Sequence, residues 1–181
     1  AERRRQELRE FETLEVVAPN VVFEDSLTLW LGARRVDLVD RGPANSPHDV
    51  TVTVPDAGVL FTGDIVVQSP LPYVFSVWPL PWADVLRDLE AEGAKVIVPG
   101  HGPVMQDHTY TRQLRTLFET VASRVREMIA RGMTLDQIQA AADFSDVRRS
   151  VPVWAPAALD EDWKYSMEQL VERTFRHLRG Q

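Results

Sequence analysis

Residues 96–103 read Val-Ile-Val-Pro-Gly-His-Gly-Pro, so an apolar run ends in two glycines that enclose His101. Residues 59–64 read Val-Leu-Phe-Thr-Gly-Asp, which repeats this design and ends on the carboxylate of Asp64. Short apolar runs bounded by glycine or proline are typical of strands buried in a sheet. Glycine also lets the backbone adopt unusual angles and approach a ligand closely. The two stretches therefore predict two buried strands whose ends carry Asp64 and His101 at the open edge of a sheet.

The segments before these strands alternate apolar and polar residues. This pattern predicts strands over residues 21–24, 27–31, 35–40 and 50–54, the last of which reads Val-Thr-Val-Thr-Val. Residues 55–58, Pro-Asp-Ala-Gly, then have the composition of a tight turn. Short strands joined by tight turns favour an antiparallel meander packed on one face.

The later part of the chain has the pattern of helices. Helices are predicted over residues 82–91, 107–130 and 160–179, and a capping box of Thr134 and Gln137 opens another that reaches about residue 142. Strands followed by helices predict a layered α/β (α+β) fold, in which helices cover a mixed, largely antiparallel sheet. We expect a charged helix over 1–14, a sheet-rich part over 15–105, and a C-terminal helical extension of the same domain over 106–181.

Residues 68–81 are rich in proline and aromatic residues. Four prolines disfavour regular structure, whereas Tyr73, Phe75 and Trp78 supply large apolar side chains. The segment is either a loop held to the core by its aromatic residues or a wall over a pocket, since loops on rigid scaffolds commonly carry binding residues. In the second interpretation, Tyr73, Phe75 and Trp78 form a wall for a small, partly apolar substrate.

The overall composition excludes several classes of protein. Lys and Arg together number 20 against 27 Asp and Glu, and the net charge of −7 argues against a nucleic-acid partner. No apolar run approaches the roughly 20 residues that span a bilayer. The chain contains no cysteine, so any metal site must use histidines, carboxylates and amides. None of these features assigns a cellular compartment.

Asp64 and His101 both carry side chains that bind zinc well. Taken singly, each has a plainer explanation, because an Asp after a strand commonly caps a helix and a His between glycines commonly lies in a turn. A third loop of the same kind, residues 42–49, reads Gly-Pro-Ala-Asn-Ser-Pro-His-Asp and precedes the 50–54 strand. Three such loops in one chain favour a metal site.

The three motifs resemble those of the C-terminal half of metallo-β-lactamase-fold hydrolases. That family has Gly-x-Ala-His-(Thr/Ser)-x-Gly-Asp, then Val-Leu-Phe-x-Gly-Asp, then Val-x-Pro-Gly-His-Gly, matching residues 42–49, 59–64 and 96–102 here. The resemblance implies that Asp64 bridges two zinc ions at the catalytic centre, that His101 is a terminal ligand of the second ion, and that Asp49 supports the site from behind the ligands. It also implies a metal-bound hydroxide that attacks an ester, lactone, lactam or thioester bond of a small-molecule substrate.

Two features depart from the family pattern. Asn45 stands where a histidine ligand is usual, and its carboxamide is a weaker zinc ligand; a branch of the family carries Asn there and also resembles residues 71–75. The family's leading motif, His-x-His-x-Asp-His, does not occur in the 181 residues. The resemblance therefore implies one or two zinc ions in the complete fold, and weak or absent binding by this chain alone.

The alternative hypothesis is a non-catalytic interaction or assembly module made of half the fold. Two sheets pack face to face in this family, so half of it would leave an apolar sheet face bare, and large exposed apolar patches indicate a partner. A homodimer or a missing N-terminal half would cover this face. We expect the face to contain six residues: Val50, Val52, Val54, Leu60, Val96 and Val98.

Overall fold

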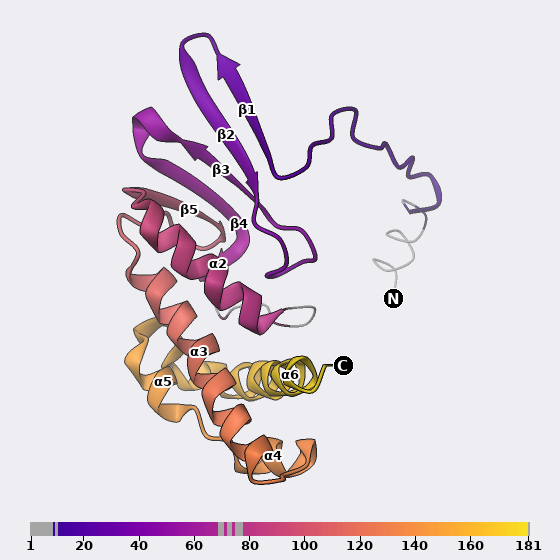
Figure 1. The fold of residues 1–181 in the computed structure, drawn as a ribbon, viewed down its shortest axis with the longest axis vertical. Coiled ribbons are helices and arrows are strands. Elements are labelled where there is room, and N and C mark those ends of the chain that lie inside the picture. The colour runs from indigo at the N-terminus through magenta and orange to yellow at the C-terminus, as the bar shows by residue number, and fades with distance from the viewer. Residues whose placement is uncertain (1–8, 10, 69–70, 72–73, 75–77, 181) are drawn as a thin grey trace.

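The computed structural model describes residues 9, 11–68, 71, 74 and 78–180. In this part of the chain, five strands form one sheet in the order β1-β2-β3-β4-β5 (Figure 1). Neighbours among the first four strands are antiparallel, whereas β5 runs parallel to β4. The prediction of a mixed, largely antiparallel sheet is therefore confirmed. The strand bounds are Ser26–Leu31 for β1, Arg34–Asp40 for β2, Val50–Val54 for β3, Val59–Val67 for β4 and Val96–His101 for β5.

Helix α2, Pro79–Glu92, connects the two parallel strands, and the other helices whose bounds the structure describes follow β5. They are α3 (Thr109–Ala130), α4 (Leu135–Ala141), α5 (Ser145–Ser150) and α6 (Asp160–Leu178), with short 3-10 turns η1 (Pro55–Ala57), η2 (Pro152–Trp154) and η3 (Ala157–Leu159). The predicted capping box is present at α4, where the Thr134 hydroxyl accepts from the backbone N–H of Gln137. Among the described residues, no helix is long and apolar enough to cross a membrane.

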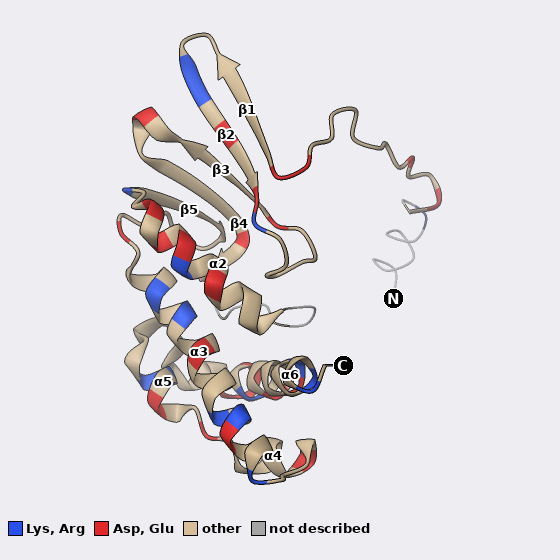
Figure 2. Ribbon diagram, in the orientation of Figure 1, with Lys and Arg blue, Asp and Glu red and all other residues tan. Residues whose placement is uncertain are grey.

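The core lies between one face of the sheet and the helices. Trp82 of α2 is fully buried, stacks on Phe118 of α3 at a ring distance of 4.6 Å, and donates its indole N–H to the carbonyl of Ile65 in β4. Leu60 of β4 belongs to the same buried cluster. Charged residues are spread along α2 and α3 (Figure 2). One ion pair links the two helices, with Arg115 of α3 binding Glu90 of α2 at 2.7 Å. This ion pair joins α2 to α3 above the buried aromatic pair.

The opposite face of the sheet is apolar, and no helix among the described residues covers it. The registers place Leu27 opposite Leu38, Leu38 opposite Val52, Val52 opposite Phe61 and Phe61 opposite Val98. This row crosses all five strands, and Phe61 remains 42% exposed. We call this surface the open sheet face. Its other apolar members lie at the alternate positions of the same strands: Leu29, Leu31, Val36, Val50, Val54, Val59 and Val96.

One predicted member of that face lies on the other side of the sheet. Leu60 is buried against the helices, because successive side chains of a strand point to opposite faces and Phe61 occupies the open one. The predicted strand over residues 21–24 is also wrong. Val21 and Val22 are exposed without strand pairing, and β1 begins only at Ser26. Alternation alone does not make a strand when no partner strand lies beside it.

Proline placement explains a further difference. Residues 68–81 were expected to lack regular structure, but α2 begins at Pro79. Proline is tolerated in the first helical turn, where the missing N–H has no intrahelical acceptor.

Two other elements differ from the prediction. The short helix α5 was not predicted at all. Strand β4 also continues to Val67, so Asp64 lies inside the strand and not after it.

Trp82→Phe should lower the free energy of unfolding by about 2 kcal/mol, because the Ile65 carbonyl loses its donor and the smaller ring leaves a gap. Urea denaturation followed by circular dichroism measures this change. The matched control is Trp30→Phe on β1, where the side chain is 66% exposed, and we expect a change below about 0.5 kcal/mol there. Equal losses in the two variants would contradict the role given to Trp82.

Candidate metal centre

Asp64 and His101 lie side by side on the two parallel strands. Asp64 belongs to β4 and His101 is the last residue of β5, and the His101 Nε2 atom is 3.5 Å from the Asp64 Oδ1 atom. Their side chains are 44% and 64% exposed. The two residues that the sequence singled out separately are thus brought together at one edge of the sheet, and an ion or ligand can reach both.

Gly100 makes this approach possible. A Cβ atom added there would lie 2.1 Å from Asp64 Oδ1 and 2.7 Å from the carbonyl carbon of Gly63. Real Cβ atoms do not come so close to other heavy atoms, so only glycine fits between the two strands. The ladder is also irregular here, with register shifts between Phe61 and Gly63 and between Gly63 and Val67. A bulge of this kind re-aims a side chain, and here it lies directly before Asp64.

The backbone after His101 turns back onto β4. The His101 carbonyl accepts from the Gln68 N–H at 2.9 Å. At Gly102, which has φ +108°, an added Cβ would lie 2.9 Å from the Gln68 Cβ. Gly102 therefore allows close packing against Gln68, and Gly100 allows the close approach of Asp64.

The loop over residues 42–49 is held by its own polar groups. The Asp49 carboxylate accepts from both the backbone N–H and the hydroxyl of Ser46, at 2.8 and 2.9 Å. Asn45 is half-buried next to the fully buried Ala44. The Ala44 carbonyl accepts from the backbone N–H of Trp78, which ties this loop to the start of α2. The roles of Asn45 as a weak ligand and of Asp49 behind the ligands remain predictions.

His48 of the same loop pairs with an acidic residue of β2. Its Nδ1 atom is 2.9 Å from Asp40 Oδ2, and the imidazole is 77% exposed. The Asp40 carboxylate also accepts from the backbone N–H of Gly42, and this bond together with the His48 contact lowers the pKa of Asp40. The Asp40–His48 pair closes the base of the loop.

Of the predicted substrate wall, only Trp78 can be placed. Trp78 is half-buried immediately before α2. Tyr73 and Phe75 lie outside the described residues. The wall interpretation therefore stays a prediction.

The pair fits part of a zinc site. Two ligand atoms about 2.1 Å from a tetrahedral zinc ion lie about 3.4 Å apart, which agrees with the 3.5 Å between His101 and Asp64. Within residues 9, 11–68, 71, 74 and 78–180, however, no three His, Cys, Asp or Glu side chains converge on one point. The described residues therefore offer two of the four positions that zinc takes, and the other ligands must come from elsewhere or from water.

Sequence reasoning missed the polar residues beside this pair. The buried Tyr110 hydroxyl donates to the Val67 carbonyl at 2.8 Å and accepts from the Trp154 indole at 3.2 Å. Burial raises the pKa of Tyr110, so the phenol stays protonated and keeps donating. Gln68 directly follows β4, four residues after Asp64, and this spacing alone does not indicate a functional role.

These features define an α/β protein with a metal-competent edge where two parallel strands meet. The chain belongs to the metallo-beta-lactamase superfamily, because the family's sequence model matches residues 2–101, more than half of the chain. The fold and the Asp64–His101 edge agree with the resemblance seen in the three motifs.

Individual proteins resemble this chain only at low sequence identity. A linear primary-alkylsulfatase from Pseudomonas sp. (strain ATCC 19151) is 26% identical over 132 residues, which cover 67% of this chain and 25% of that protein. The structure of the sec-alkylsulfatase Pisa1 from Pseudomonas sp. matches with a TM-score of 0.65 at 19% identity, over 90% of this chain and 27% of the other. A metallo-beta-lactamase from Pontibacter korlensis matches with a TM-score of 0.52 at 22% identity, over 62% and 54% of the two chains. The chain thus spans about a quarter of the length of these two sulfatases.

Gly100→Ala should lower the free energy of unfolding by about 3 kcal/mol, because the new methyl group forces β4 and β5 apart. The control is Gly32→Ala, where no atom lies within 4 Å of the added Cβ and only the φ of +65° opposes alanine; we expect about 1 kcal/mol there. Denaturant titration measures both losses. A Gly100→Ala protein no less stable than Gly32→Ala would show that the close approach at Asp64 is not needed.

Proposed function

We propose that this chain carries part of the active site of a zinc-dependent hydrolase that cleaves an ester-type bond of a small molecule. The observation that carries the proposal is the Asp64–His101 pair, whose two ligand atoms are spaced for one zinc ion. Membership of the metallo-beta-lactamase superfamily supports the same chemistry.

Each residue of the pair has a distinct part. Asp64 supplies an anionic oxygen, and His101 supplies a ring nitrogen that binds metal only when it is unprotonated, so metal and proton compete at this position. Zinc, when bound, lowers the pKa of a coordinated water toward 7 and polarises the bond to be broken. Both ligands stand on strands of one sheet, and this support limits their movement during binding.

The substrate class is narrowed by the relatives and by charge. Two of the similar proteins are named as alkylsulfatases, so alkyl sulfate esters are the first substrates to test, with carboxylic esters, thioesters, lactones and lactams after them. The net charge of −7 disfavours polyanionic substrates such as nucleic acids. The half-buried indole of Trp78, tied to the Asn45 loop through Ala44, supports an apolar group in the substrate.

His101→Ala and Asp64→Asn should each weaken zinc binding at least tenfold, because each removes one of two ligands. Isothermal titration calorimetry with zinc chloride measures this, and we expect weak, reversible binding by the unaltered chain. His177→Ala, in the last turn of α6, is the control and should bind as the unaltered chain does. Zinc binding that survives both site substitutions would place the ion elsewhere and remove the basis of the proposal.

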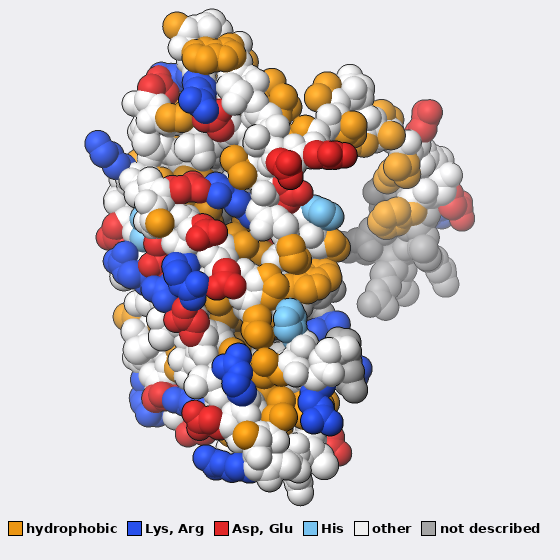
Figure 3. Space-filling view, viewed as in Figure 1, with side chains coloured by type: hydrophobic (Ala, Val, Ile, Leu, Met, Phe, Trp, Pro, Cys, Tyr) orange, Lys and Arg blue, Asp and Glu red, His pale blue; other side chains and the backbone are white. Residues whose placement is uncertain are grey.

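A second candidate function is assembly through the open sheet face. A continuous apolar row across five strands, with Phe61 42% exposed, is the observation that favours it. The segment before β1 extends away from the sheet (Figure 1), and its apolar residues are exposed as well: Phe11, Leu14, Val16, Val17, Val21 and Val22. A separate group of hydrophobic side chains lies on the helical side of the molecule, which Figure 3 draws, and is not part of the open sheet face. We propose that a second copy of the chain covers the open sheet face.

Phe61→Glu should convert a dimer of this chain into a monomer, because the carboxylate would be buried without a partner in the apolar contact. Sedimentation equilibrium measures the change, and we expect the dissociation constant to rise at least a hundredfold. Val153→Glu, at a site with similar exposure (40%) near α5, should leave the dimer intact. A chain that is monomeric before substitution would rule out self-association through this face.

A further inference from the structure

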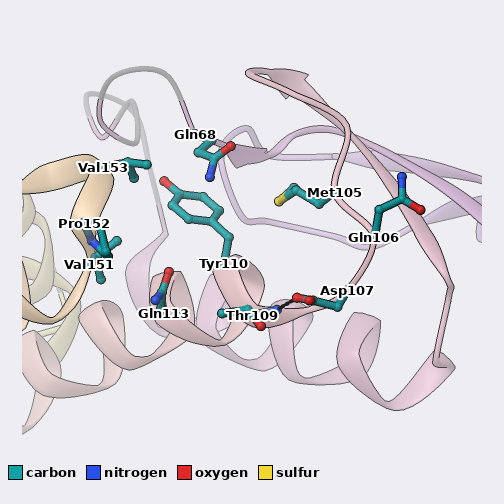
Figure 4. Close-up of a pocket in the computed structure, with 10 residues that line it drawn as sticks. All are labelled: Gln68, Met105, Gln106, Asp107, Thr109, Tyr110, Gln113, Val151, Pro152 and Val153. Carbon is teal, nitrogen blue, oxygen red and sulfur yellow. Dashed lines mark hydrogen bonds between the residues drawn. The ribbon is translucent and has the colours of Figure 1, made fainter.

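A cavity of about 400 Å³ lies beside the Asp64–His101 edge. Figure 4 shows it between the end of β4, the segment that follows β5, the start of α3 and the turn η2. Its volume lies within the range of about 300–1,000 Å³ that is usual for small-molecule pockets. Neither of the two candidate zinc ligands lines it.

The cavity is joined to the candidate metal centre by the backbone. Gln68 forms part of its wall, and the N–H of this residue donates to the His101 carbonyl at 2.9 Å. Gly102 packs directly on the Gln68 side chain. A molecule that contacts Gln68 in the cavity therefore touches a residue whose backbone is hydrogen-bonded to that of the predicted zinc ligand.

Much of the lining is apolar. Figure 4 shows Val151, Pro152 and Val153 on one side of the Tyr110 ring and Met105 on the other, and these side chains supply carbon surface. Tyr110 is fixed in place, because its hydroxyl bonds both Val67 and Trp154. The apolar lining suits an aliphatic chain.

Carboxamides supply the polar part of the lining. Figure 4 shows the amide group of Gln68 above the Tyr110 ring, with Gln113 below it on α3. The Gln68 Oε1 atom is buried and has no hydrogen-bond partner among the described residues. An amide that is not saturated by the protein can donate to, or after rotation accept from, a polar group of a ligand.

The charge of the lining disfavours anions. Asp107 carries the only formal charge among the residues that line the cavity, and its carboxylate accepts from the Thr109 N–H at 2.6 Å. The Thr109 hydroxyl, followed by this backbone bond, lowers the pKa of Asp107, so the group is ionised at neutral pH. Arg112 and His108 lie near this carboxylate and lower its pKa further, but neither lines the cavity. An anionic head group in the cavity therefore meets Asp107 and no lining cation, which favours an uncharged group there.

We propose that this cavity is the subsite for the uncharged, aliphatic part of the substrate, and that the carboxamide of Gln68 binds an uncharged polar group in substrates whose aliphatic part carries one. The inference rests on the proposed hydrolase function, since it takes the reacting bond to lie at the Asp64–His101 edge. The charged or reacting end of the substrate lies at that edge, and the aliphatic chain extends into the cavity away from it.

Octanamide is the probe that tests the subsite, because it pairs an uncharged amide with an aliphatic chain of suitable size and is measured without zinc. Isothermal titration calorimetry of the 181-residue chain in EDTA should show octanamide binding at least tenfold more tightly than octanoate. Butanamide should bind more weakly than octanamide, because it buries less apolar surface. Gln68→Leu should weaken octanamide binding about fivefold through loss of the hydrogen bond.

Val153→Glu should weaken octanamide binding at least tenfold, because it places a charge at the rim of the cavity. Phe61→Glu, on the open sheet face, is the matched control and should bind octanamide as the unaltered chain does. Absence of octanamide binding, equal binding of octanoate, or loss in Phe61→Glu but not in Val153→Glu would overturn the proposal. Since these titrations contain no zinc, octanamide binding by a chain that takes up no zinc supports the subsite while the proposed hydrolase function fails.

Discussion

The close approach of β4 and β5 at Gly100 is the constraint on which the site depends. Asp64 Oδ1 occupies the space that a side chain at residue 100 would fill, so the carboxylate comes within 3.5 Å of the His101 imidazole. Two groups that favour the same cation then stand together on strands whose other side is packed against α2 and α3. Without the glycine, the strands would have to separate, and the spacing that suits a tetrahedral ion would be lost.

One face of the sheet is buried under the helices and the other is exposed. Leu60 and its face are buried by Trp82, Phe118 and the helices that carry them. The face with Phe61 is equally apolar but has no cover within the described residues. A sheet stabilised from one side alone keeps its fold while presenting a surface that water solvates poorly. The hydrolase and assembly hypotheses are therefore compatible, because covering the open face leaves the strand ends accessible.

Much of this arrangement could be predicted from local sequence. Period-two alternation located β2 and β3, and the apolar runs before Gly63 and Gly100 located the buried parts of β4 and β5. The Leu60 orientation could not be predicted, because alternation defines two faces without saying which one the helices cover. Alternation also failed at residues 21–24, where no partner strand lies beside the chain.

The candidate site, like the fold, could be predicted from the sequence only in part. Glycine spacing and ligand chemistry identified Asp64 and His101, but their 3.5 Å separation depends on the parallel pairing of β4 with β5 across a 14-residue helix. Gln68 and Tyr110 gave no comparable signal, since a glutamine after a strand and a tyrosine on a helix are ordinary residues until the fold brings them to one cavity. The same backbone hydrogen bond that positions Gln68 ends on the His101 carbonyl. A shift of the His101 backbone is therefore transmitted to Gln68, which couples the candidate metal centre to the wall of the cavity.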